Sequence, residues 1–416
     1  MPVSWTSRYA KRTAGITSSV IRELLKLVRK PGMISFAGGL PAPEVFPVAR
    51  IRESCLRVLD HAGPEALQYS PTEGYLPLRE QIAAGLASQG VPLRAENILI
   101  TCGSQQALDL LGKLLIDSGD RIVVEAPTYL GALQAFDVFG AEYVAVPVDH
   151  DGLCLDQVEA ALRSGPKFLY VMPNFQNPAG VTLALERRRQ LVSLAEKFGV
   201  PIVEDDPYEK LRYEGESLPP LIALDPAYRG PGEAGGGNVI YLSTFSKTLA
   251  PGLRLGWIAG PAGVIAKLVQ IKQGADLHTS TFSQMLAYEA ATGGFLERHT
   301  RTICRVYRER RDAMLDALQA MLPPGAACTR PQGGLFLWAT LPEGMDSRAL
   351  LEHALAEGVA FVPGDCFYAG GSEIGRRQMR LNFSYVEPER IREGIRRLSA
   401  ALRRYMDERG MTTAAK

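Results

Sequence analysis

Residues 239–254 read VIYLSTFSKTLAPGLR, and this stretch decides both the fold and the chemistry that the chain supports. Its first four residues are β-branched, aromatic or aliphatic, which predicts a buried strand. Lys247 follows in the loop that leaves the strand, with Ser246 beside it and Arg254 seven residues on. An amine that forms a Schiff base needs a rigid, desolvated position, and a dianionic phosphate needs hydroxyl groups and an arginine. The stretch therefore predicts a lysine that binds pyridoxal phosphate, although taken alone it fits a surface lysine equally well.

An acidic pair follows a second apolar strand in residues 200–208, which read VPIVEDDPY. Asp205 is the candidate partner of the pyridine nitrogen, because a carboxylate within ~4 to 6 Å favours the protonated ring. Successive side chains at a strand end point to opposite sides, so only one of Asp205 and Asp206 can face the ring. Tyr208 is a candidate donor to the ring oxygen of the cofactor. The alternative for the acidic run is an N-cap of the following turn.

Three further strand ends carry suitable side chains. Asn177, in an Asn-Pro segment, can hydrogen-bond the phenolic oxygen of the cofactor. Gly103 precedes a helix of regular apolar spacing, so Ser104 and Gln105 would lie where free backbone amides bind a phosphate. Tyr129 ends the next expected strand and offers an aromatic plate to the pyridine face. Taken singly, these residues also fit an ordinary turn, an N-cap and a core tyrosine.

The five candidates at 104, 129, 177, 205 and 247 follow one another at successive strand ends, and longer stretches accompany them. These are FAGGLPAPE at 36–44, LQYSPTEGYLPLR at 67–79 and RLNFS at 380–384. With them the chain resembles the fold-type I, class I and II aminotransferases over nearly its whole length. It is most similar to the branch that contains 2-aminoadipate and kynurenine/aminoadipate aminotransferases.

The resemblance implies a role in cofactor binding for each matching residue. In similar enzymes, the lysine at Lys247 forms the Schiff base, and the residues at Asp205 and Tyr208 contact the ring nitrogen and the ring oxygen. The positions that match phosphate ligands are Ser104, Gln105, Ser246 and Arg254. The tyrosine that matches Tyr69 reaches the phosphate of the neighbouring subunit, which implies a homodimer with shared active sites.

Two positions depart from the family pattern without removing a functional group. Thr244 stands where relatives often have serine, and it keeps the hydroxyl that the cofactor site uses. Asn177 is followed by Pro-Ala-Gly where Pro-Thr-Gly is commoner. We therefore expect both residues to serve the cofactor site.

Arg380 matches the arginine that holds the α-carboxylate of the substrate. A guanidinium can pair bidentately with a carboxylate and so fix the orientation of the bond to be broken. Residues 379–383 alternate between apolar and polar side chains, which predicts a strand with one polar face. Asn174 and the backbone of Gly39 are expected to support the same carboxylate.

The choice of substrate side chain is assigned to residues 20–27, which resemble the N-terminal helix of 2-aminoadipate aminotransferases. Arg22 matches an arginine of that helix that faces the substrate side chain, and Ser19 lies one turn before it. We expect Arg22 to pair with the distal carboxylate of 2-aminoadipate or glutamate and to swing away for apolar substrates. A solvated or ion-paired surface arginine is the alternative.

Alternating strands and helices from about residue 97 to 260 predict a doubly wound α/β sheet. The resemblance implies a fold-type I large domain with a mostly parallel, seven-stranded sheet flanked by helices, plus a smaller α+β domain. The expected divisions are an N-terminal arm with the substrate-side helix at 1–45, a large cofactor-binding domain at 46–317 and a small domain at 318–416. The small domain, with the N-terminal segment, is expected to close over the substrate.

The composition sets bounds on the partners of the chain. Its 416 residues carry a formal net charge of +1, and 46% are hydrophobic and 22% charged, which is ordinary for a soluble globular protein. No basic block is long or interleaved with aromatic residues, so we expect no nucleic-acid partner. The run Arg187-Arg188-Arg189 lies in an expected helix, and its pattern predicts a solvated face.

The cysteines and the N-terminus indicate the cellular compartment in which the protein is expected. The six cysteines are scattered, and the five histidines form no ligand-spaced cluster, which argues against a disulfide framework or a metal site. The N-terminus lacks the apolar core of a signal peptide, and no apolar stretch approaches the ~18 to 20 residues that span a bilayer. We therefore expect a cytoplasmic protein that has no membrane partner.

The expected reaction is a ping-pong transamination, in which an L-amino acid gives its amino group to a 2-oxo acid, usually 2-oxoglutarate. The candidate donors are 2-aminoadipate and glutamate, with leucine and aromatic amino acids as further possibilities, and Lys247 would move the α-proton as base and acid. Another fold-type I reaction, such as β-elimination or decarboxylation, is one alternative. A pyridoxal-phosphate-sensing transcription regulator is a weaker alternative. Such a regulator needs an N-terminal DNA-binding domain, whereas the aminotransferase pattern starts near residue 16.

Overall fold

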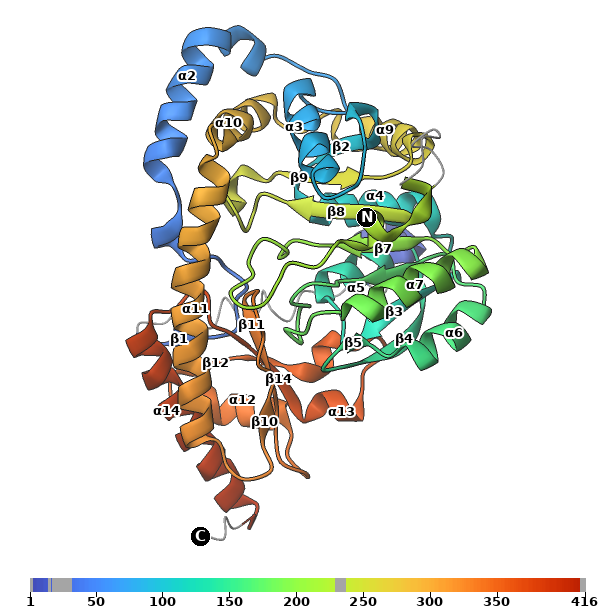
Figure 1. The fold of residues 1–416 in the computed structure, drawn as a ribbon. Coiled ribbons are helices and arrows are strands. Elements are labelled where there is room, and N and C mark those ends of the chain that lie inside the picture. Colours follow the sequence, from blue (N-terminus) through green and yellow to red (C-terminus); the bar gives the residue numbers. More distant parts are fainter. Residues whose placement is uncertain (1–2, 14–15, 17–31, 229–236, 412–416) are drawn as a thin grey trace.

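The computed structural model describes residues 3–13, 16, 32–228 and 237–411. Two of the expected substrate residues, Ser19 and Arg22, lie outside these ranges. The described chain forms a large domain around one extended sheet and a smaller domain around a short one (Figure 1). Two 3-10 turns, η1 (Trp5–Arg8) and η2 (Lys11–Thr13), precede both domains in the sequence.

The large sheet has the strand order β2-β9-β8-β7-β6-β3-β4-β5 among the described residues. In that order the bounds are β2 (Ile98–Thr101), β9 (Gly256–Ala259), β8 (Val239–Thr244), β7 (Ile202–Asp205), β6 (Leu169–Val171), β3 (Arg121–Ala126), β4 (Glu142–Asp149) and β5 (Gly152–Leu153). The run from β8 to β4 is parallel, whereas β9 pairs antiparallel with both β8 and β2. The expected mostly parallel sheet is confirmed, and the two-residue β5, an antiparallel partner of β4, adds an eighth strand to the seven expected.

Helices cover both faces of this sheet, which is why its central strands are buried on both sides. On β8, Ile240 and Leu242 pack into one apolar cluster, whereas Val239 and Tyr241 pack into another. The first cluster takes in α4 (Gly103–Leu115), α5 (Leu130–Asp137) and α9 (Ala262–Asp276). The second takes in α3 (Leu76–Ala87), α6 (Leu155–Arg163), α7 (Leu185–Phe198), α8 (Leu221–Leu224) and α10 (Thr281–Ala291).

The small domain is built on an antiparallel sheet of order β10-β11-β14-β13. Its strands are β10 (Ala327–Cys328), β11 (Phe336–Thr340), β14 (Gln378–Asn382) and β13 (Val362–Pro363). Its helices are α12 (Ser347–Ala356), α13 (Glu373–Arg376) and α14 (Pro388–Glu408). The long helix α11 (Phe295–Met321) runs from the large domain down to α14 and joins the two domains (Figure 1).

The N-terminal segment crosses between the domains. Its first strand, β1 (Ile34–Ser35), pairs parallel with β12 (Val359–Ala360) of the small domain. Residues 36–44 then lead to α2 (Val48–Ala66), which packs against α10 of the large domain. The Tyr307 hydroxyl of α11 accepts a hydrogen bond from the Ala42 amide at 3.0 Å, so this crossing segment is tied to the joining helix.

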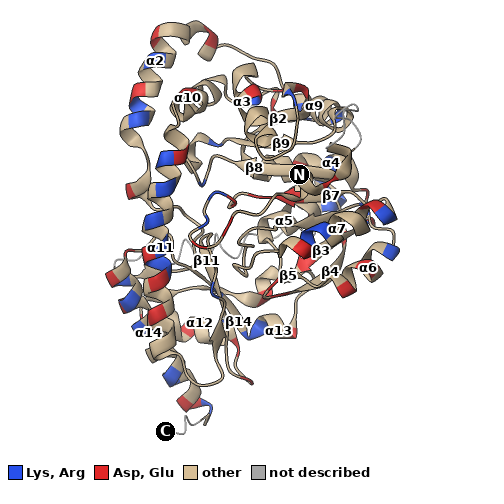
Figure 2. Ribbon diagram, viewed as in Figure 1, with Lys and Arg blue, Asp and Glu red and all other residues tan. Residues whose placement is uncertain are grey.

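The charges are mixed along the chain, with both signs on α2, α11 and α14 (Figure 2). The expected solvated face at Arg187-Arg188-Arg189 is wrong for its middle residue. Arg187 pairs with Asp149 and Arg189 is exposed, but Arg188 is fully buried. A helix turns by about 100° per residue, so three consecutive arginines cannot share one environment.

No helix in the described part of the chain has both the length and the apolar character needed to cross a membrane. Within the same residues, no group of three or more potential metal ligands comes together. The six cysteines are all free.

Candidate active site

Lys247 lies in the turn that follows β8, at the carboxyl edge of the parallel strands. Its Nζ donates a hydrogen bond to the Gly39 carbonyl oxygen at 3.1 Å and lies 5.9 Å from the centre of the Tyr208 ring. Burial, together with the smaller effect of the nearby charges of Arg380 and Arg254, lowers the pKa of Lys247 to about 8. A substantial fraction of the amine is therefore neutral and nucleophilic near physiological pH.

A cradle for an anion lies at the N-terminus of α4. No side chain caps the first turn of this helix, so the amides at its start remain available. The Arg254 guanidinium sits directly over Gly103, where an added Cβ would lie 2.6 Å from Nη2. Arg254 has a positive φ of 52°, and Gly103 one of 72°, so both backbones turn to make this close approach. Free amides and a guanidinium together fit a phosphate group.

The other expected phosphate ligands shape the cradle. The Ser246 amide donates to Thr244 Oγ1 at 3.0 Å, and Thr244 Oγ1 donates in turn to the Leu255 carbonyl at 2.7 Å. Gln105 Nε2 donates to the Gly131 carbonyl at 2.9 Å, while Ser104 Oγ lies 3.5 Å from the Ser243 carbonyl. Thr244 thus links the lysine turn to the segment that leads into β9.

Asp205 ends β7 with one oxygen satisfied and one open. The Tyr170 hydroxyl donates to Oδ2 at 2.8 Å, whereas Oδ1 is buried and has no partner among the described residues. Burial raises the pKa of Asp205 to about 6, and the hydrogen bond from Tyr170 opposes this rise. A buried carboxylate oxygen without a partner is costly, and a protonated ring nitrogen would supply the missing donor.

Asp206 points away from this site, as the alternation of side chains along a strand requires. Its Oδ2 accepts a hydrogen bond from Asn174 Nδ2 at 2.8 Å, and its Oδ1 accepts one from the Glu209 amide at 3.1 Å. Of the acidic pair, only Asp205 therefore keeps an open oxygen.

Arg380 is 2% exposed on β14, with its guanidinium 4.3 Å from the centre of the Phe336 ring and 5.0 Å from that of Phe367. Its Nη1 donates to Asn177 Oδ1 at 2.9 Å and its Nη2 to the Ala37 carbonyl at 2.8 Å. Its Nε has no partner, and no carboxylate of the described residues forms an ion pair with it. Burial lowers the pKa of Arg380 to about 10. A buried cation with an open donor fits an incoming carboxylate.

Asn174 was expected to help hold the substrate carboxylate, but in the structure its side chain hydrogen-bonds to two other residues. Its Nδ2 donates to Asp206, and its Oδ1 accepts a hydrogen bond from Arg188 at 2.7 Å. The amide that reaches Arg380 belongs to Asn177, which also neighbours the Tyr208 hydroxyl. Asn174 and Asn177 are three positions apart in one loop, and both were expected to face the site.

Of the two tyrosines expected at the cofactor, Tyr129 is close to the site in this chain and Tyr69 lies at the surface. Tyr129 caps the start of α5, and its ring folds over Gly131, where an added Cβ would lie 2.5 Å from the ring. Burial and the charge of Asp205 raise its pKa, and the charges of Arg380 and Arg254 oppose this rise. Tyr69, by contrast, is 78% exposed and meets only the edge of the His278 ring at 5.8 Å.

Sequence reasoning missed Tyr170, Arg188 and the two rings that flank Arg380. Tyr170 lies in an apolar strand and looks like a core residue, although a buried tyrosine hydroxyl usually has a partner. Phe336 and Phe367 carry no polar group that could have marked them. Their position follows only from the pairing of β11 and β14 and from the packing of the loop after β13.

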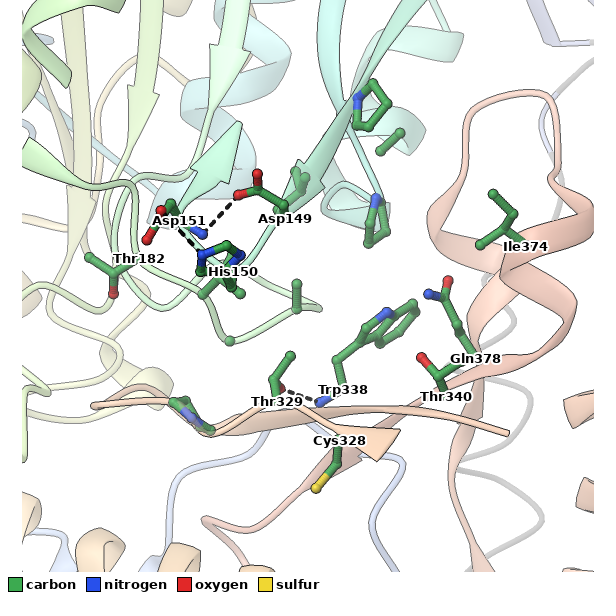
Figure 3. A pocket seen from close by; sticks show the side chains of 18 of the residues that line it. Asp149, His150, Asp151, Thr182, Cys328, Thr329, Trp338, Thr340, Ile374 and Gln378 are labelled. Carbon is green, nitrogen blue, oxygen red and sulfur yellow. Dashed lines mark hydrogen bonds and ion pairs between the residues drawn. The ribbon is translucent and has the colours of Figure 1, made fainter. Parts of the chain in front are cut away.

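A cleft of about 1010 Å³ lies between the domains, but it is not the lysine site. Figure 3 shows Asp149, His150 and Asp151 on one side of it, and Trp338 and Gln378 on the other. It is also lined by Pro127 and by 179–181, the backs of the segments that carry Tyr129 and Asn177, and Lys247 is absent from its lining. Asp205, Arg254 and Arg380 are likewise absent from the lining of this cleft.

Comparison with known proteins places the chain among proteins of similar length. The family model described as aminotransferase class I and II matches residues 34–398. The chain is 47% identical to aromatic-amino-acid aminotransferase 1 of Thermococcus litoralis, over 96% of this chain and 94% of that protein. It is 46% identical to the 2-aminoadipate transaminase of Thermus thermophilus, over 97% of this chain and 98% of that protein.

A solved structure of an aminotransferase also matches this chain over nearly its whole length. The α-aminoadipate aminotransferase of Thermus thermophilus, complexed with N-(5'-phosphopyridoxyl)-L-leucine, matches with a TM-score of 0.89 and 44% identity. The match covers 97% of this chain and all of that one. That ligand joins pyridoxal phosphate to an amino acid, and the open groups at Lys247, Asp205 and Arg380 fit the same two components.

Lys247 should become reactive toward pyridoxal phosphate as the pH rises through about 8. Because its lowered pKa is about 8, the amine is mostly protonated below that pH and mostly neutral above it. The rate of covalent attachment to the cofactor-free protein should rise about ten-fold from pH ~7 to ~9 and then level off, measured by stopped-flow absorbance. Lys247→Ala should show no attachment. A rate still rising near the ordinary lysine pKa of 10.5 would contradict the effect of burial.

Tyr170→Phe should weaken cofactor binding most at acidic pH. The substitution removes a donor that favours the charged form of Asp205, so the pKa of this carboxyl should move further above about 6. A lost hydrogen bond to a charged group is worth about 1.5 kcal/mol or more, so Kd should rise about ten-fold at pH ~6.5 and less at pH ~8.5. Absorbance titration measures both values. Tyr143→Phe, which removes a hydroxyl bonded to Asp137 at the surface, is the control, and equal effects at both pH values would argue against the mechanism.

Proposed function

Because the chain belongs to the class I and II aminotransferases, we propose that its preferred amino donors are the acidic amino acids 2-aminoadipate and glutamate. It is a pyridoxal-phosphate-dependent aminotransferase that passes the amino group of an L-amino acid to a 2-oxo acid. We propose 2-oxoglutarate as the usual acceptor. Leucine and aromatic amino acids are further donors in this proposal, because relatives bear an aromatic-amino-acid name and a bound leucine adduct.

The observation that carries the proposed recognition of amino acids and 2-oxo acids is the buried Arg380 with an open Nε and no ion-paired carboxylate among the described residues. A guanidinium in this state binds the α-carboxylate that every amino acid and every 2-oxo acid possesses. The flanking rings of Phe336 and Phe367 exclude water from it and hold it rigid. Arg380 thus explains recognition of the substrate class, but it gives no preference among side chains.

We propose that the cofactor is held by the residues that the structure leaves open around Lys247. Lys247 holds it through Nζ, Asp205 Oδ1 keeps a proton on its ring nitrogen, and Arg254 with the first turn of α4 binds its phosphate. Asn177 and Tyr208 meet its ring oxygen, and Tyr129 covers its ring. Bound in this way, the cofactor supplies an electron sink that allows the α-carbon of the amino acid to lose its proton.

The chain's own groups then carry the proton and fix the geometry. Arg380 fixes the α-carboxylate, so that the α-hydrogen is directed toward the lysine. The freed Lys247 Nζ takes the α-proton as a base, which its lowered pKa permits near neutral pH. It then gives this proton, as an acid, to the cofactor carbon that had been bonded to the lysine nitrogen.

We propose that Arg22 selects substrates with acidic side chains, and that Ser19 is its neighbour in the substrate pocket. Arg22 lies in the stretch 20–27 that resembles the substrate-side helix of 2-aminoadipate aminotransferases, and Ser19 directly precedes that stretch. A cationic group there would pair with the distal carboxylate of 2-aminoadipate or glutamate. Withdrawal of the same group would open the pocket to leucine and aromatic side chains.

We also propose a homodimer in which Tyr69 reaches the phosphate of the partner subunit. Tyr69 is 78% exposed in the single chain and close to other exposed apolar residues in sequence, which is unusual for a free surface. Those on α2 and the loop after it are Val48, Leu56, Leu59 and Leu67. The three on α2 share one face of the helix, as their helical spacing requires.

The division of labour between the parts of the chain is part of the same proposal. Residues 46–317 hold the cofactor, and residues 318–416 move with the N-terminal arm, 1–45, to close over the substrate. The pairing of β1 with β12 supports a shared movement of the arm and the small domain. We place the enzyme in the cytoplasm.

A donor panel tests the proposed substrate class. The cofactor-loaded protein is mixed with 2-aminoadipate, glutamate, leucine, phenylalanine, kynurenine or alanine, and conversion of the cofactor to its amino form is followed by absorbance. We expect 2-aminoadipate and glutamate to react fastest. Faster reaction with leucine or phenylalanine would keep the aminotransferase but overturn the acidic preference.

Arg22→Ala should raise KM for 2-aminoadipate and glutamate by about ten-fold or more, because it removes a charge-assisted pair worth about 1.5 to 3 kcal/mol. KM for leucine and phenylalanine should change little. Lys26→Ala, four positions further along the same stretch, is the matched control. Equal losses for acidic and apolar donors would exclude the proposed role of Arg22.

Arg380→Met should lower kcat/KM about a hundred-fold or more for every donor alike, because it removes the pair with the α-carboxylate common to all of them. The Kd of pyridoxal phosphate should change far less, as measured by absorbance titration in the absence of substrate. Arg376→Met, on the exposed side of α13, is the control. A loss of kcat/KM confined to acidic donors would show that Arg380 instead binds the side-chain carboxylate of the substrate.

A further inference from the structure

Arg188 is a fully buried cation in the first turn of α7, although the arginines on either side of it face solvent or form ion pairs with exposed or half-buried carboxylates. The side chain of Arg189 is 60% exposed, whereas Arg188 has no exposed surface. Taking a guanidinium out of water is costly unless its donors are satisfied. Its partners therefore indicate what the burial serves.

The Arg188 guanidinium binds both ends of the loop that carries Asn177. Its Nε donates to the Leu183 carbonyl at 2.8 Å, and its Nη2 donates to the Pro173 carbonyl at 2.9 Å. Nη1 reaches the Pro219 carbonyl at 3.0 Å, which anchors the loop to the segment before α8. Pro173 and Leu183 enclose the turn whose Asn177 contacts Arg380, so the guanidinium fixes the base of that turn.

The same guanidinium reaches the acidic pair through Asn174. Its Nη2 donates to Asn174 Oδ1 at 2.7 Å, and Asn174 Nδ2 donates to Asp206 Oδ2 at 2.8 Å. Asp206 is held further by the Ser243 hydroxyl, which donates to its carbonyl at 2.8 Å. With Asp206 fixed on this side of the sheet, the neighbouring Asp205 must face the other side, where its Oδ1 is open.

The four acceptors suit an arginine and no other side chain. They lie in diverging directions around one planar group, and three of the four are backbone carbonyls. A lysine has a single nitrogen at the end of a flexible chain and cannot reach all of them at once. None of the four is a carboxylate, although Glu204 and Asp206 are close enough to favour its charge. The group therefore works mainly as a rigid set of donors.

We propose that Arg188 is a positioning residue for the cofactor ring. Through the loop it sets Asn177, and through Asn174 and Asp206 it sets the direction of Asp205, without touching the cofactor itself. The proposal rests on the cofactor site described above and is independent of which amino acid is the substrate. It makes the middle arginine of the run a part of the active-site scaffold, whereas Arg187 binds Asp149 and the β5 backbone, and Arg189 pairs with Glu186 on the helix surface.

The test compares Arg188→Lys, Arg188→Met and Asn174→Ala with the matched control Arg189→Met, which removes an arginine one position away on the same helix. Four quantities are measured on each purified protein: thermal unfolding without cofactor, the Kd of pyridoxal phosphate, the pH dependence of the bound cofactor's absorption, and kcat and KM with glutamate. The first three need no substrate, so they separate failure of this proposal from an error in the substrate class.

We expect Arg188→Lys and Asn174→Ala to fold, to raise the Kd of pyridoxal phosphate about ten-fold and to lower kcat about ten-fold or more. The pH midpoint of the cofactor's absorption change should shift, because Asp205 and Asn177 would no longer be held in position to hydrogen-bond the cofactor ring. KM for glutamate should change less than kcat. Arg189→Met should match the unaltered protein. Arg188→Met should show the largest effects and the lowest unfolding temperature.

A purely structural role would give a different pattern. In that case Arg188→Lys and Asn174→Ala would lower the unfolding temperature but keep the Kd, the absorption and kcat within about two-fold of the unaltered protein. That result would overturn the proposal even if Arg188→Met failed to fold. Effects of the same size in Arg189→Met would overturn it as well.

Discussion

Three cationic side chains, Lys247, Arg254 and Arg380, act on one another at a single site, and no described carboxylate forms an ion pair with any of them. Burial lowers the pKa of Lys247 and that of Arg380, and the charges of Arg380 and Arg254 add to the effect on Lys247. Such a site carries uncompensated positive charge until anions enter it. A dianionic phosphate beside Arg254 and a carboxylate beside Arg380 supply that charge. The same imbalance keeps the lysine amine reactive, so binding and chemistry depend on one electrostatic arrangement.

The parallel sheet brings these groups together. Tyr129, Asn177, Asp205 and Lys247 follow β3, β6, β7 and β8, whose carboxyl ends meet at one edge because the strands are parallel. The anion cradle follows β2, which runs in the same direction as β8 because two antiparallel pairings through β9 separate them. The small domain adds Arg380 from β14, and the crossing segment adds the Gly39 carbonyl. In the proposed arrangement, substrate recognition is divided between two domains, and the cofactor residues of this chain belong to one.

Much of this arrangement could be predicted from the sequence, because each strand end carries a short apolar run followed by a polar group. The orientation of Asp205 relative to Asp206 followed from strand alternation, and the parallel order of the sheet followed from the alternation of elements. Within loops no such periodicity exists, so the sequence could not show that Asn174 bonds to Asp206 and Arg188. Arg188 was misread because a run of three charges suggests solvent, whereas its burial depends on distant carbonyls. Tyr170 was missed because only the tertiary fold brings its hydroxyl to Asp205.

The central claim is that Lys247 is the group to which the cofactor is attached. The most direct measurement is to load the protein with pyridoxal phosphate, reduce it with sodium borohydride, and locate the phosphopyridoxyl group by peptide mass spectrometry. The account predicts stoichiometric labelling of Lys247, with glutamate preventing the label when it is added before reduction. Labelling of another lysine, such as the exposed Lys210 or the buried Lys272, or the absence of any label on Lys247, would contradict it.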